Sequence, residues 1–300
     1  MRLPINRSGK RELSKSVSLK VKLSGFLRLI RPVNCLMMGL AVIVGAFLAR
    51  GERIEILSLT LGFLTAFTFT GASMALNDYY DREIDMINAP TRPIPSGIIT
   101  PKEAVFMSLL LTLIGFVSAL LTNLNCFLLT IIAWILFTVY STKGKRTGLI
   151  GNMMVSTCVS IPFIYGGYIA SNNFNVVTLI FSGMAFLANT GREITKGITD
   201  IAGDKLRGIN TVAVTYGSRV AAILSAIFYL SAVFLSVIPY FEKSLSIWYI
   251  PTLILADAGF IYSSISLLIN QSRENARKVK NIVLIWMLLG LISFLSGSVL

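Results

Sequence analysis

Residues 56–85 read ILSLTLGFLTAFTFTGASMALNDYYDREID. The first part, 56–76, carries no charge and is long enough to cross a hydrocarbon core of about 30 Å as a helix, which needs roughly 20 residues. The remainder is rich in acids. If the helix continues past its apolar part, Asn77, Asp81 and Asp85 fall at positions i, i+4 and i+8 on one face. This stretch therefore predicts a membrane-spanning helix that ends in an acidic ridge.

Eight further apolar runs are comparable with 56–76. They are 33–49, 104–122, 126–141, 149–170, 175–191, 218–240, 245–269 and 281–300. Backbone polar groups in lipid must be satisfied within the segment, so each run should be a helix rather than a loop or an open strand. The run 245–269 contains Asp257, which is costly in lipid and should therefore face the bundle interior. We predict an all-α membrane protein with nine transmembrane helices.

The composition excludes several classes of protein. The chain of 300 residues is 54% hydrophobic and 14% charged, which makes a water-soluble enzyme improbable. It has no histidine, so an imidazole-ligated haem, a histidine-containing zinc site and a Ser-His-Asp triad are all excluded. The three cysteines lie far apart and indicate neither a disulfide framework nor a thiolate cluster.

The distribution of basic residues predicts the orientation. Of 27 Lys and Arg residues, 24 lie in the N-terminal segment or after an even-numbered run, and three lie in the other connections. The positive-inside rule then places the protein in the cell membrane, with the N-terminus and active site cytoplasmic and the C-terminus outside. We expect a basic cytoplasmic tail over 1–24, with residues 13–31 as a basic interfacial helix; the alternative for residues 1–15 is a solvated, disordered segment.

Acidic residues form two clusters that oppose this positive bias. The first cluster is the ridge at 78–85, and the second comprises Glu193, Asp200 and Asp204, at positions i, i+7 and i+11. Both clusters follow even-numbered runs, four runs apart, which predicts two related four-helix halves plus a ninth helix. Like charges at these spacings repel unless a cation lies between them, and carboxylates without His or Cys suit Mg²⁺ and its usual partner, a diphosphate. The predicted metal ligands are Asn77, Asp78, Asp81, Asp85, Asp200 and Asp204.

Basic residues near the clusters are candidates for binding phosphate. Arg92 lies in a turn, Thr91-Arg92-Pro93-Ile94-Pro95, whose prolines favour a fixed presentation of its guanidinium. The other candidates are Lys143, Lys145, Arg146, Arg192 and Lys196. The alternative is that these residues merely mark the cytoplasmic side, and for Lys145 the two interpretations stand equal.

With these residues in view, the chain resembles the UbiA superfamily of intramembrane prenyltransferases. The resemblance covers about 25–300 and rests on Asn77-Asp78-x-x-Asp81-x-x-x-Asp85, Arg92-Pro93-Ile94-Pro95-Ser96-Gly97, the segment from Tyr140 to Lys145, and Asp200-x-x-x-Asp204. It implies a single UbiA-type domain whose aspartates bind two Mg²⁺ ions and, through them, the diphosphate of an isoprenoid donor. It also implies that Arg92 and Lys145 bind phosphate or guide the leaving group, and that the donor tail occupies an apolar groove.

The segment 191–204, GREITKGITDIAGD, resembles the archaeal members that synthesise ether lipids. That resemblance implies transfer of a geranylgeranyl group to the hydroxyl of geranylgeranylglyceryl phosphate, a lipid phosphate acceptor. The catalytic candidates are then Asp81, Glu193 and Lys145, with Asp81, Glu193 or free diphosphate as proton acceptor. Tyr79, Tyr80 and Tyr140 are either partners for an allylic cation or interface aromatics.

Other functions remain open at this point. The nearest is a UbiA-type enzyme that prenylates an aromatic acid or quinone precursor, because its donor chemistry would be the same. A Mg²⁺ channel or transporter is a different class, but both acidic clusters lie on one side and only Asp257 lies at membrane depth. Nucleic acid is not an expected partner.

Overall fold

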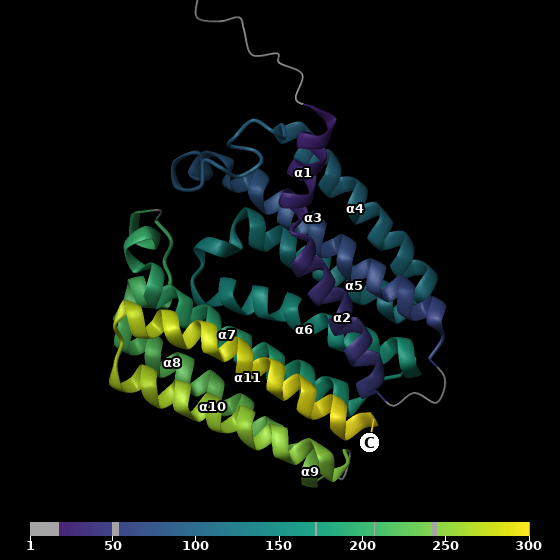
Figure 1. Cartoon of the computed structure of the whole chain (residues 1–300), viewed down its shortest axis with the longest axis vertical. Coiled ribbons are helices and arrows are strands. Elements are labelled where there is room, and N and C mark those ends of the chain that lie inside the picture. Colours follow the sequence, from purple (N-terminus) through teal and green to yellow (C-terminus); the bar gives the residue numbers. More distant parts are fainter. Residues whose placement is uncertain (1–17, 50–53, 172, 207, 242–244, 300) are drawn as a thin grey trace, which may run out of the picture.

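A computed structural model describes residues 18–49, 54–171, 173–206, 208–241 and 245–299, and every regular element within these ranges is a helix (Figure 1). In chain order the elements are α1 (Leu19–Ile30), α2 (Pro32–Leu48), α3 (Ile56–Asn88), α4 (Pro101–Thr122), α5 (Leu124–Thr142), the 3₁₀ helix η1 (Gly144–Arg146), α6 (Leu149–Ser171), α7 (Val176–Leu206), α8 (Val212–Ser236), α9 (Ile238–Phe241), the 3₁₀ helix η2 (Ile247–Tyr249), α10 (Ile250–Ile269) and α11 (Arg273–Val299). The all-α prediction is confirmed for the described residues, and each predicted apolar run forms most of one helix.

The predicted count of nine spans is not confirmed. Among the described residues, seven helical segments are long and apolar enough to cross a membrane, and α1 with α2, bent by 47°, makes an eighth if the pair is one span. Helix α7 is not among them, because Asn189, Arg192 and Glu193 interrupt its apolar character. The predicted interfacial helix over 13–31 corresponds in its described part to α1, and residues 1–17 of the predicted tail lie outside the described residues.

Helices α3 and α7 both continue beyond their apolar parts, as the spacing of their acids predicts. They contain 33 and 31 residues. At about 1.5 Å per residue such helices approach 50 Å in length, well beyond a hydrocarbon core of about 30 Å. The last turns of both helices therefore stand clear of the apolar layer and carry the two acidic clusters.

Glycines allow the two halves of the bundle to meet closely where α2 crosses α6. A Cβ atom at Gly166 would lie 2.1 Å from the carbonyl oxygen of Val42, and one at Gly45 would lie 2.2 Å from that of Phe163. Small residues are the usual means by which membrane helices approach. Around this crossing, α3 packs against α2 and α4, while α7 packs against α6, α8 and α11. Corresponding helices thus have corresponding neighbours, although the twofold repeat itself stays a prediction.

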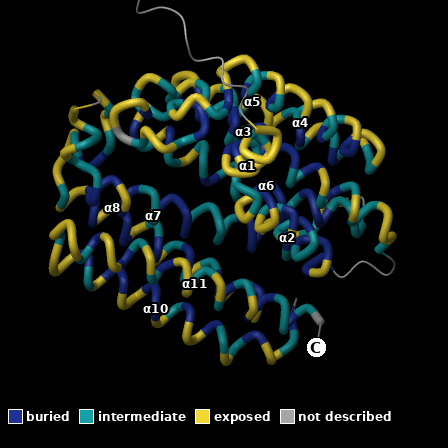
Figure 2. The backbone as a smooth tube through the Cα atoms, turned by 45° about the horizontal axis from the view of Figure 1, so that its top comes forward, coloured by how far each residue is buried: buried dark blue, intermediate teal, exposed yellow. Residues whose placement is uncertain are grey.

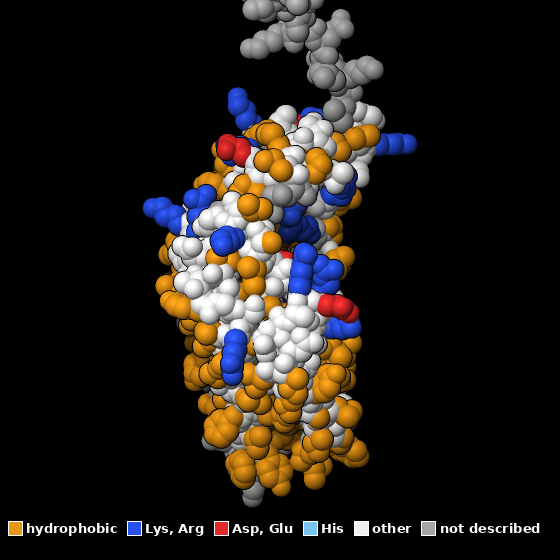
Figure 3. All heavy atoms as spheres, turned by 90° about the vertical axis from the view of Figure 1, so that its left-hand side faces the viewer, with side chains coloured by type: hydrophobic (Ala, Val, Ile, Leu, Met, Phe, Trp, Pro, Cys, Tyr) orange, Lys and Arg blue, Asp and Glu red, His pale blue; other side chains and the backbone are white. Residues whose placement is uncertain are grey.

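The outer surface is suited to lipid. Figure 2 shows exposed positions along the outer faces of α4 and α10, and large apolar side chains there are exposed, among them Phe106, Leu113, Leu121, Ile254 and Ile269. On the face shown in Figure 3, charged side chains lie at the upper end and around the middle, while the lower end is hydrophobic. The chain is a multi-pass membrane protein with a charged end, where α3 and α7 terminate.

Candidate active site at the ends of α3 and α7

The first acidic cluster lies on the last three turns of α3. Asp78 and Asp85 are 3% and 6% exposed. Asp81 is half-buried, and one of its oxygens accepts a hydrogen bond from the side-chain amide of Asn77 at 3.1 Å. Burying carboxylates is costly unless cations neutralise them. The cluster therefore needs basic partners, and the fold supplies them from three other segments.

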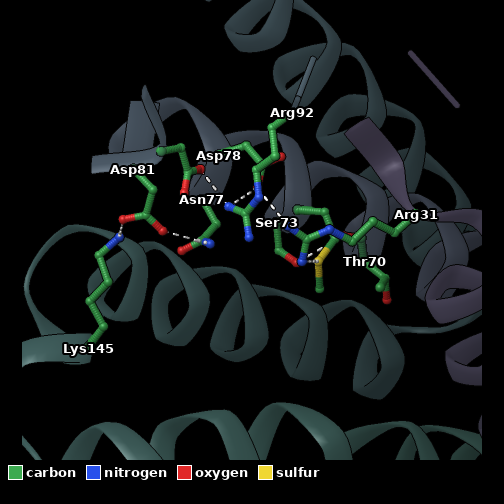
Figure 4. A network of polar contacts seen from close by, with 10 residues as sticks. Arg31, Thr70, Ser73, Asn77, Asp78, Asp81, Arg92 and Lys145 are labelled. Atoms are coloured by element: carbon green, nitrogen blue, oxygen red, sulfur yellow. Dashed lines mark hydrogen bonds and ion pairs between the residues drawn. The ribbon is translucent and has the colours of Figure 1, made fainter. Parts of the chain in front are cut away.

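Three basic residues pair with the α3 acids (Figure 4). Arg31 lies between α1 and α2, and its Nη2 is 2.7 Å from Asp78 Oδ1. Arg92 follows α3, and its Nη1 is 2.5 Å from Asp85 Oδ2 and 3.5 Å from Asp78 Oδ1. Lys145, from η1, forms an ion pair with Asp81. The result is a chain of alternating charges along one helix end.

The turn that carries Arg92 is tightly folded, as its prolines predict. The backbone amide of Ser96 donates to the carbonyl of Arg92 at 3.0 Å, and that of Ile99 donates to the carbonyl of Pro93 at 3.0 Å. Gly97 completes the turn with φ 73°, a left-handed value that glycine adopts without strain. Arg92 therefore does more than mark the charged end, because the turn directs its guanidinium onto two carboxylates. Its role in binding phosphate stays a prediction.

Lys145 is the one residue of its basic loop that joins the network. Its side chain is 19% exposed, whereas Lys143 and Arg146 are exposed and have no ion pair among the described residues. The loop is held against the α7–α8 connection at Gly148, where a Cβ atom would lie 2.2 Å from the carbonyl oxygen of Asn210. The fold thus selects Lys145, which the sequence could not do.

The second cluster lies on the last turns of α7. The carboxylate of Glu193 accepts hydrogen bonds from Arg192 and from Lys196, each at 3.2 Å. Asp200 accepts one from the hydroxyl of Thr199 at 2.9 Å. Asp200 and Asp204 line a polar cavity of about 240 Å³ with Thr199, Ala202, Gly203 and Arg273. Glu193 therefore has local cations, whereas Asp200 has an uncharged partner and faces a cavity.

Tyr140 lies within electrostatic range of one acid from each cluster. This half-buried residue, one turn before η1, lies close enough to both Asp81 and Glu193 to be influenced by the charge of each. Within the described ranges no group of three or more acids and cysteines converges as a metal site, and the α3 acids pair with Arg31, Arg92 and Lys145. The predicted metal ligands therefore stay a prediction as ligands, although they share one end of the bundle.

An apolar cavity of about 380 Å³ lies on α7 farther from this charged end. Its lining comes from α6, α7 and α8 and consists of Ser160, Leu179, Ile180, Ser182, Gly183, Phe186 and Leu235. Leu179 and Phe186 precede Glu193 and Asp200 at intervals of seven residues, so all four share one face of α7. The cavity thus lies on the face that leads to the acidic cluster.

Sequence reasoning missed two arginines and left Asp257 undecided. Arg31 and Arg273 belong to no acidic motif, yet Arg31 binds Asp78 and the Nε of Arg273 donates to the carbonyl of Thr199 at 3.0 Å. For Arg31 the available signal was its place before Pro32, since a residue before proline disfavours helix and marks a break. Asp257 accepts a hydrogen bond from Ser236 on α8 at 2.8 Å, so it makes the interior polar contact that its cost in lipid predicts.

Comparisons with known proteins agree with this architecture. The model of the UbiA prenyltransferase family matches residues 38–291. Digeranylgeranylglyceryl phosphate synthase of Methanosphaera stadtmanae is 36% identical over 274 residues, which cover 91% of this chain and 98% of that protein. The enzyme of the same name from Archaeoglobus fulgidus is 35% identical over 285 residues, covering 94% of this chain and 97% of that protein.

Solved structures give the same result. One reported under the name digeranylgeranylglyceryl phosphate synthase has a TM-score of 0.83 and 32% identity, and the match covers 93% of this chain and 99% of that one. A UbiA homologue from Archaeoglobus fulgidus bound to GPP and Mg²⁺ has the same fold, with a TM-score of 0.66 and 19% identity over 90% of this chain and 99% of that one. The acidic helix ends, the apolar bundle and these matches over nearly the whole length establish that the chain belongs to the UbiA prenyltransferase family.

Proposed function

We propose that this chain transfers a geranylgeranyl group from geranylgeranyl diphosphate to the hydroxyl of geranylgeranylglyceryl phosphate, releasing diphosphate, in ether-lipid synthesis. The observation that carries the proposal is the network of Asp78, Asp81 and Asp85 with Arg92 and Lys145 at one end of an apolar bundle. A prenyl diphosphate has a highly charged head and an apolar tail. The charged network at one end of the bundle matches the head, and the apolar interior matches the tail. The choice of acceptor is supported by the relatives named digeranylgeranylglyceryl phosphate synthase.

The acids at the ends of α3 and α7 suit Mg²⁺ as a cofactor. Their donor set consists of hard oxygens, which this ion prefers, and Mg²⁺ is usually held by few carboxylates together with substrate phosphate oxygens. Asp78, Asp81 and Asp85 would hold it on one side, with Asp200 and Asp204 on the other. Bound Mg²⁺ neutralises charge on the diphosphate and so makes it a better leaving group.

The basic residues would bind the diphosphate and stabilise its departure. Arg92 presents a guanidinium that fits two phosphate oxygens at once, and Lys145 supplies a second, mobile positive charge. As the bond from C1 to the diphosphate oxygen breaks, negative charge grows on the leaving group, and both side chains stabilise it there. Their present carboxylate partners would be exchanged for phosphate oxygens when the donor binds.

The acceptor oxygen then forms the new bond to C1, and its proton must be removed. The carboxylates of Asp81 and Glu193, one from each acidic cluster, are the candidates, and departing diphosphate is the third. The apolar cavity that ends in Leu179 and Phe186 would hold a prenyl tail and keep water away from the reacting carbon.

The charged end is assigned to the cytoplasm. The positive-inside rule supports this orientation, because 24 of the 27 basic residues belong to the N-terminal segment or to connections at that end. The N-terminus and active site would be cytoplasmic and the C-terminus outside. A cytoplasmic site would also lie on the side of the membrane where the phosphate groups of both substrates meet water.

The test is an acceptor panel with the purified full-length chain in detergent. With geranylgeranyl diphosphate, we expect a doubly prenylated ether from geranylgeranylglyceryl phosphate, and no product when EDTA removes Mg²⁺. The comparison acceptor is 4-hydroxybenzoate, which represents the aromatic prenyltransferases. Product from 4-hydroxybenzoate and none from the glyceryl phosphate would overturn the proposed acceptor while leaving the family assignment intact. Full activity in EDTA would overturn the metal requirement.

A further inference from the structure

Arg31 has a left-handed backbone conformation that is costly for an arginine. It joins α1 to α2 with φ 53° and ψ 71°, and it is the one non-glycine with positive φ among the described residues. Pro32 follows it and disfavours continuation of the α1 helix through Arg31. A left-handed conformation is costly for a residue with a Cβ atom, and glycine would avoid that cost. The retention of an arginine at this break suggests that its side chain has a task.

The side chain of Arg31 is only partly satisfied. One terminal nitrogen, Nη2, bonds Asp78 at 2.7 Å, but the other, Nη1, has the thioether sulfur of Met74 as its partner at 3.2 Å. A thioether is a weak acceptor, whereas a guanidinium forms its strongest bonds with two anionic oxygens. The side chain is 34% exposed, so a ligand can reach it. Arg31 is therefore a fixed cation with one donor edge available to an anion.

Neighbouring contacts hold α1, and thus Arg31, against the rest of the site. Arg28 donates to the carbonyl oxygen of Thr91 at 2.6 Å, next to Arg92, and Lys22 lies 2.5 Å from the carboxylate of Glu103 at the start of α4. One bond from α1 to the segment that carries Arg92, and a second to the start of α4, fix the position of Arg31 relative to Arg92. Such preorganisation is what a binding site requires.

Of the two cations assigned to the donor, Lys145 lies at the other end of the network from Arg31, whereas Arg92 shares the carboxylate of Asp78 with it. In Figure 4, Arg31 and Lys145 lie at opposite ends of the network, with Asn77, Asp78 and Arg92 between them. Lys145 pairs with Asp81 at the end of the network that is farther from Arg31. If the diphosphate lies on that side, Arg31 remains for a second anion. The proposed reaction has one, since its acceptor also carries a phosphate.

We propose that Arg31 binds the phosphate of the acceptor and so selects a phosphorylated alcohol over a neutral one. This assignment rests on the proposed function. It makes Arg31 a specificity-determining residue rather than a contributor to bond cleavage, because its guanidinium contacts the acceptor phosphate and not the reacting carbon. A purely structural role, by contrast, would affect all acceptors alike.

The experiment compares acceptors in the wild type and in Arg31→Gln. We expect the KM for geranylgeranylglyceryl phosphate to rise about 10- to 100-fold, through loss of a bond between charged groups, and the donor KM, which Arg31 can affect only through Asp78, to rise far less. Geranylgeranylglycerol, which lacks the phosphate, should be used poorly by the wild type and equally poorly by the variant. Arg31→Lys should restore part of the preference, because it keeps the charge but loses the bidentate geometry.

Two further variants keep the test decisive. Arg31→Gly suits the left-handed backbone, so it removes the side chain without strain if Arg31→Gln folds poorly. Arg219→Gln, an exposed arginine of α8 without an ion pair among the described residues, is the matched control and should change neither KM. An unchanged acceptor KM, or equal rises in both KM values, would overturn the assignment. Failure of the proposed function would instead appear in the wild type, as absence of product from the glyceryl phosphate.

Discussion

Asp81 is the residue at which the elements of the site meet. It belongs to α3, pairs with Lys145 from η1, accepts a bond from Asn77 and influences Tyr140 of α5. These contacts are polar and contribute little to apolar packing, because Asp81 lies on the part of α3 beyond its apolar run. Removing its charge should therefore affect chemistry far more than folding.

Asp81→Asn should lower turnover by about 10²- to 10⁴-fold, the range for removal of a group that acts on a proton. Asp200→Ala should also abolish turnover, because its carboxylate faces the polar cavity on α7. Product formation is measured by thin-layer chromatography, and folding by the melting temperature in detergent, which should stay close to that of the wild type. Glu274→Gln is the control, since Glu274 pairs with Lys278 on the surface and is 79% exposed. Wild-type turnover in both variants would contradict the two-sided acidic site.

Asp257 should behave differently from the site acids. It lies on α10 and accepts a hydrogen bond from Ser236, and its neighbours include none of the acidic clusters. Asp257→Asn keeps an acceptor and should leave turnover unchanged. Ser236→Ala leaves a partly buried carboxylate without its donor and should destabilise the protein by about 1–3 kcal/mol. Denaturation in detergent and the acceptor assay together check this, and a loss of turnover in Asp257→Asn without loss of stability would assign it a role in the reaction.

At the scale of elements, the sequence predicts helices better than it predicts breaks between them. The extension of α3 follows from an uncharged run joined to acids at helical spacing, and both can be read locally. Helix α7 shows the limit of hydropathy, because Asn189 and Arg192 lie within a continuous helix that does not qualify as a span. Local sequence patterns thus predict where helices form. Which helices span the membrane depends also on where their polar residues form contacts in the folded chain.

Contacts between distant segments account for what the sequence could not supply. The loop after α5 contains three basic residues that the sequence does not distinguish: Lys143, Lys145 and Arg146. Only the folded structure makes Lys145 the partner of Asp81. Arg31 is separated from Asp78 by 47 positions, and no motif connects the two. Acidic ligands can be recognised because they repeat along one helix, but their counter-ions come from elements that approach only in the folded chain.

The crossing of α2 and α6 offers a test at the element scale. Gly166→Ala places a Cβ atom 2.1 Å from the Val42 carbonyl, so the helices must separate. We expect a loss of about 1–3 kcal/mol, as for other overpacked sites. Gly290→Ala is the matched control, because a Cβ there meets no atom within 4 Å and alanine favours a helix. The melting temperature in detergent should fall for the first variant and stay level or rise for the second; equal responses would contradict close packing at this crossing.

At the scale of the whole molecule, charge and hydropathy divide the protein along its long direction. The face in Figure 3 carries charged side chains at its upper end and around its middle, and its lower end is apolar. The formal net charge of +13 conceals this arrangement, because half of the 14 acids lie among the basic residues near the site. The basic residues therefore serve two purposes: they set the orientation in the membrane, and some of them neutralise the buried acids.

The orientation can be measured across a single helix. Lys143 and Asn173 are exposed residues that flank α6, a candidate span of 23 residues. After replacement of Cys35, Cys126 and Cys158 by alanine, Lys143→Cys and Asn173→Cys provide single thiols on opposite sides. A membrane-impermeant maleimide should label position 173 in intact cells and position 143 only in inverted vesicles, since the positive-inside rule places the basic loop in the cytoplasm.

This pair of positions also separates orientation from the fold. Labelling of both from one side would show that α6 does not cross the membrane, which would contradict the bundle itself. The reverse pattern, with position 143 labelled in intact cells, would keep the bundle but place the acidic clusters outside. Lys145 lies two residues from position 143 and pairs with Asp81, so the side on which position 143 is labelled is the side from which the substrate phosphates reach the site.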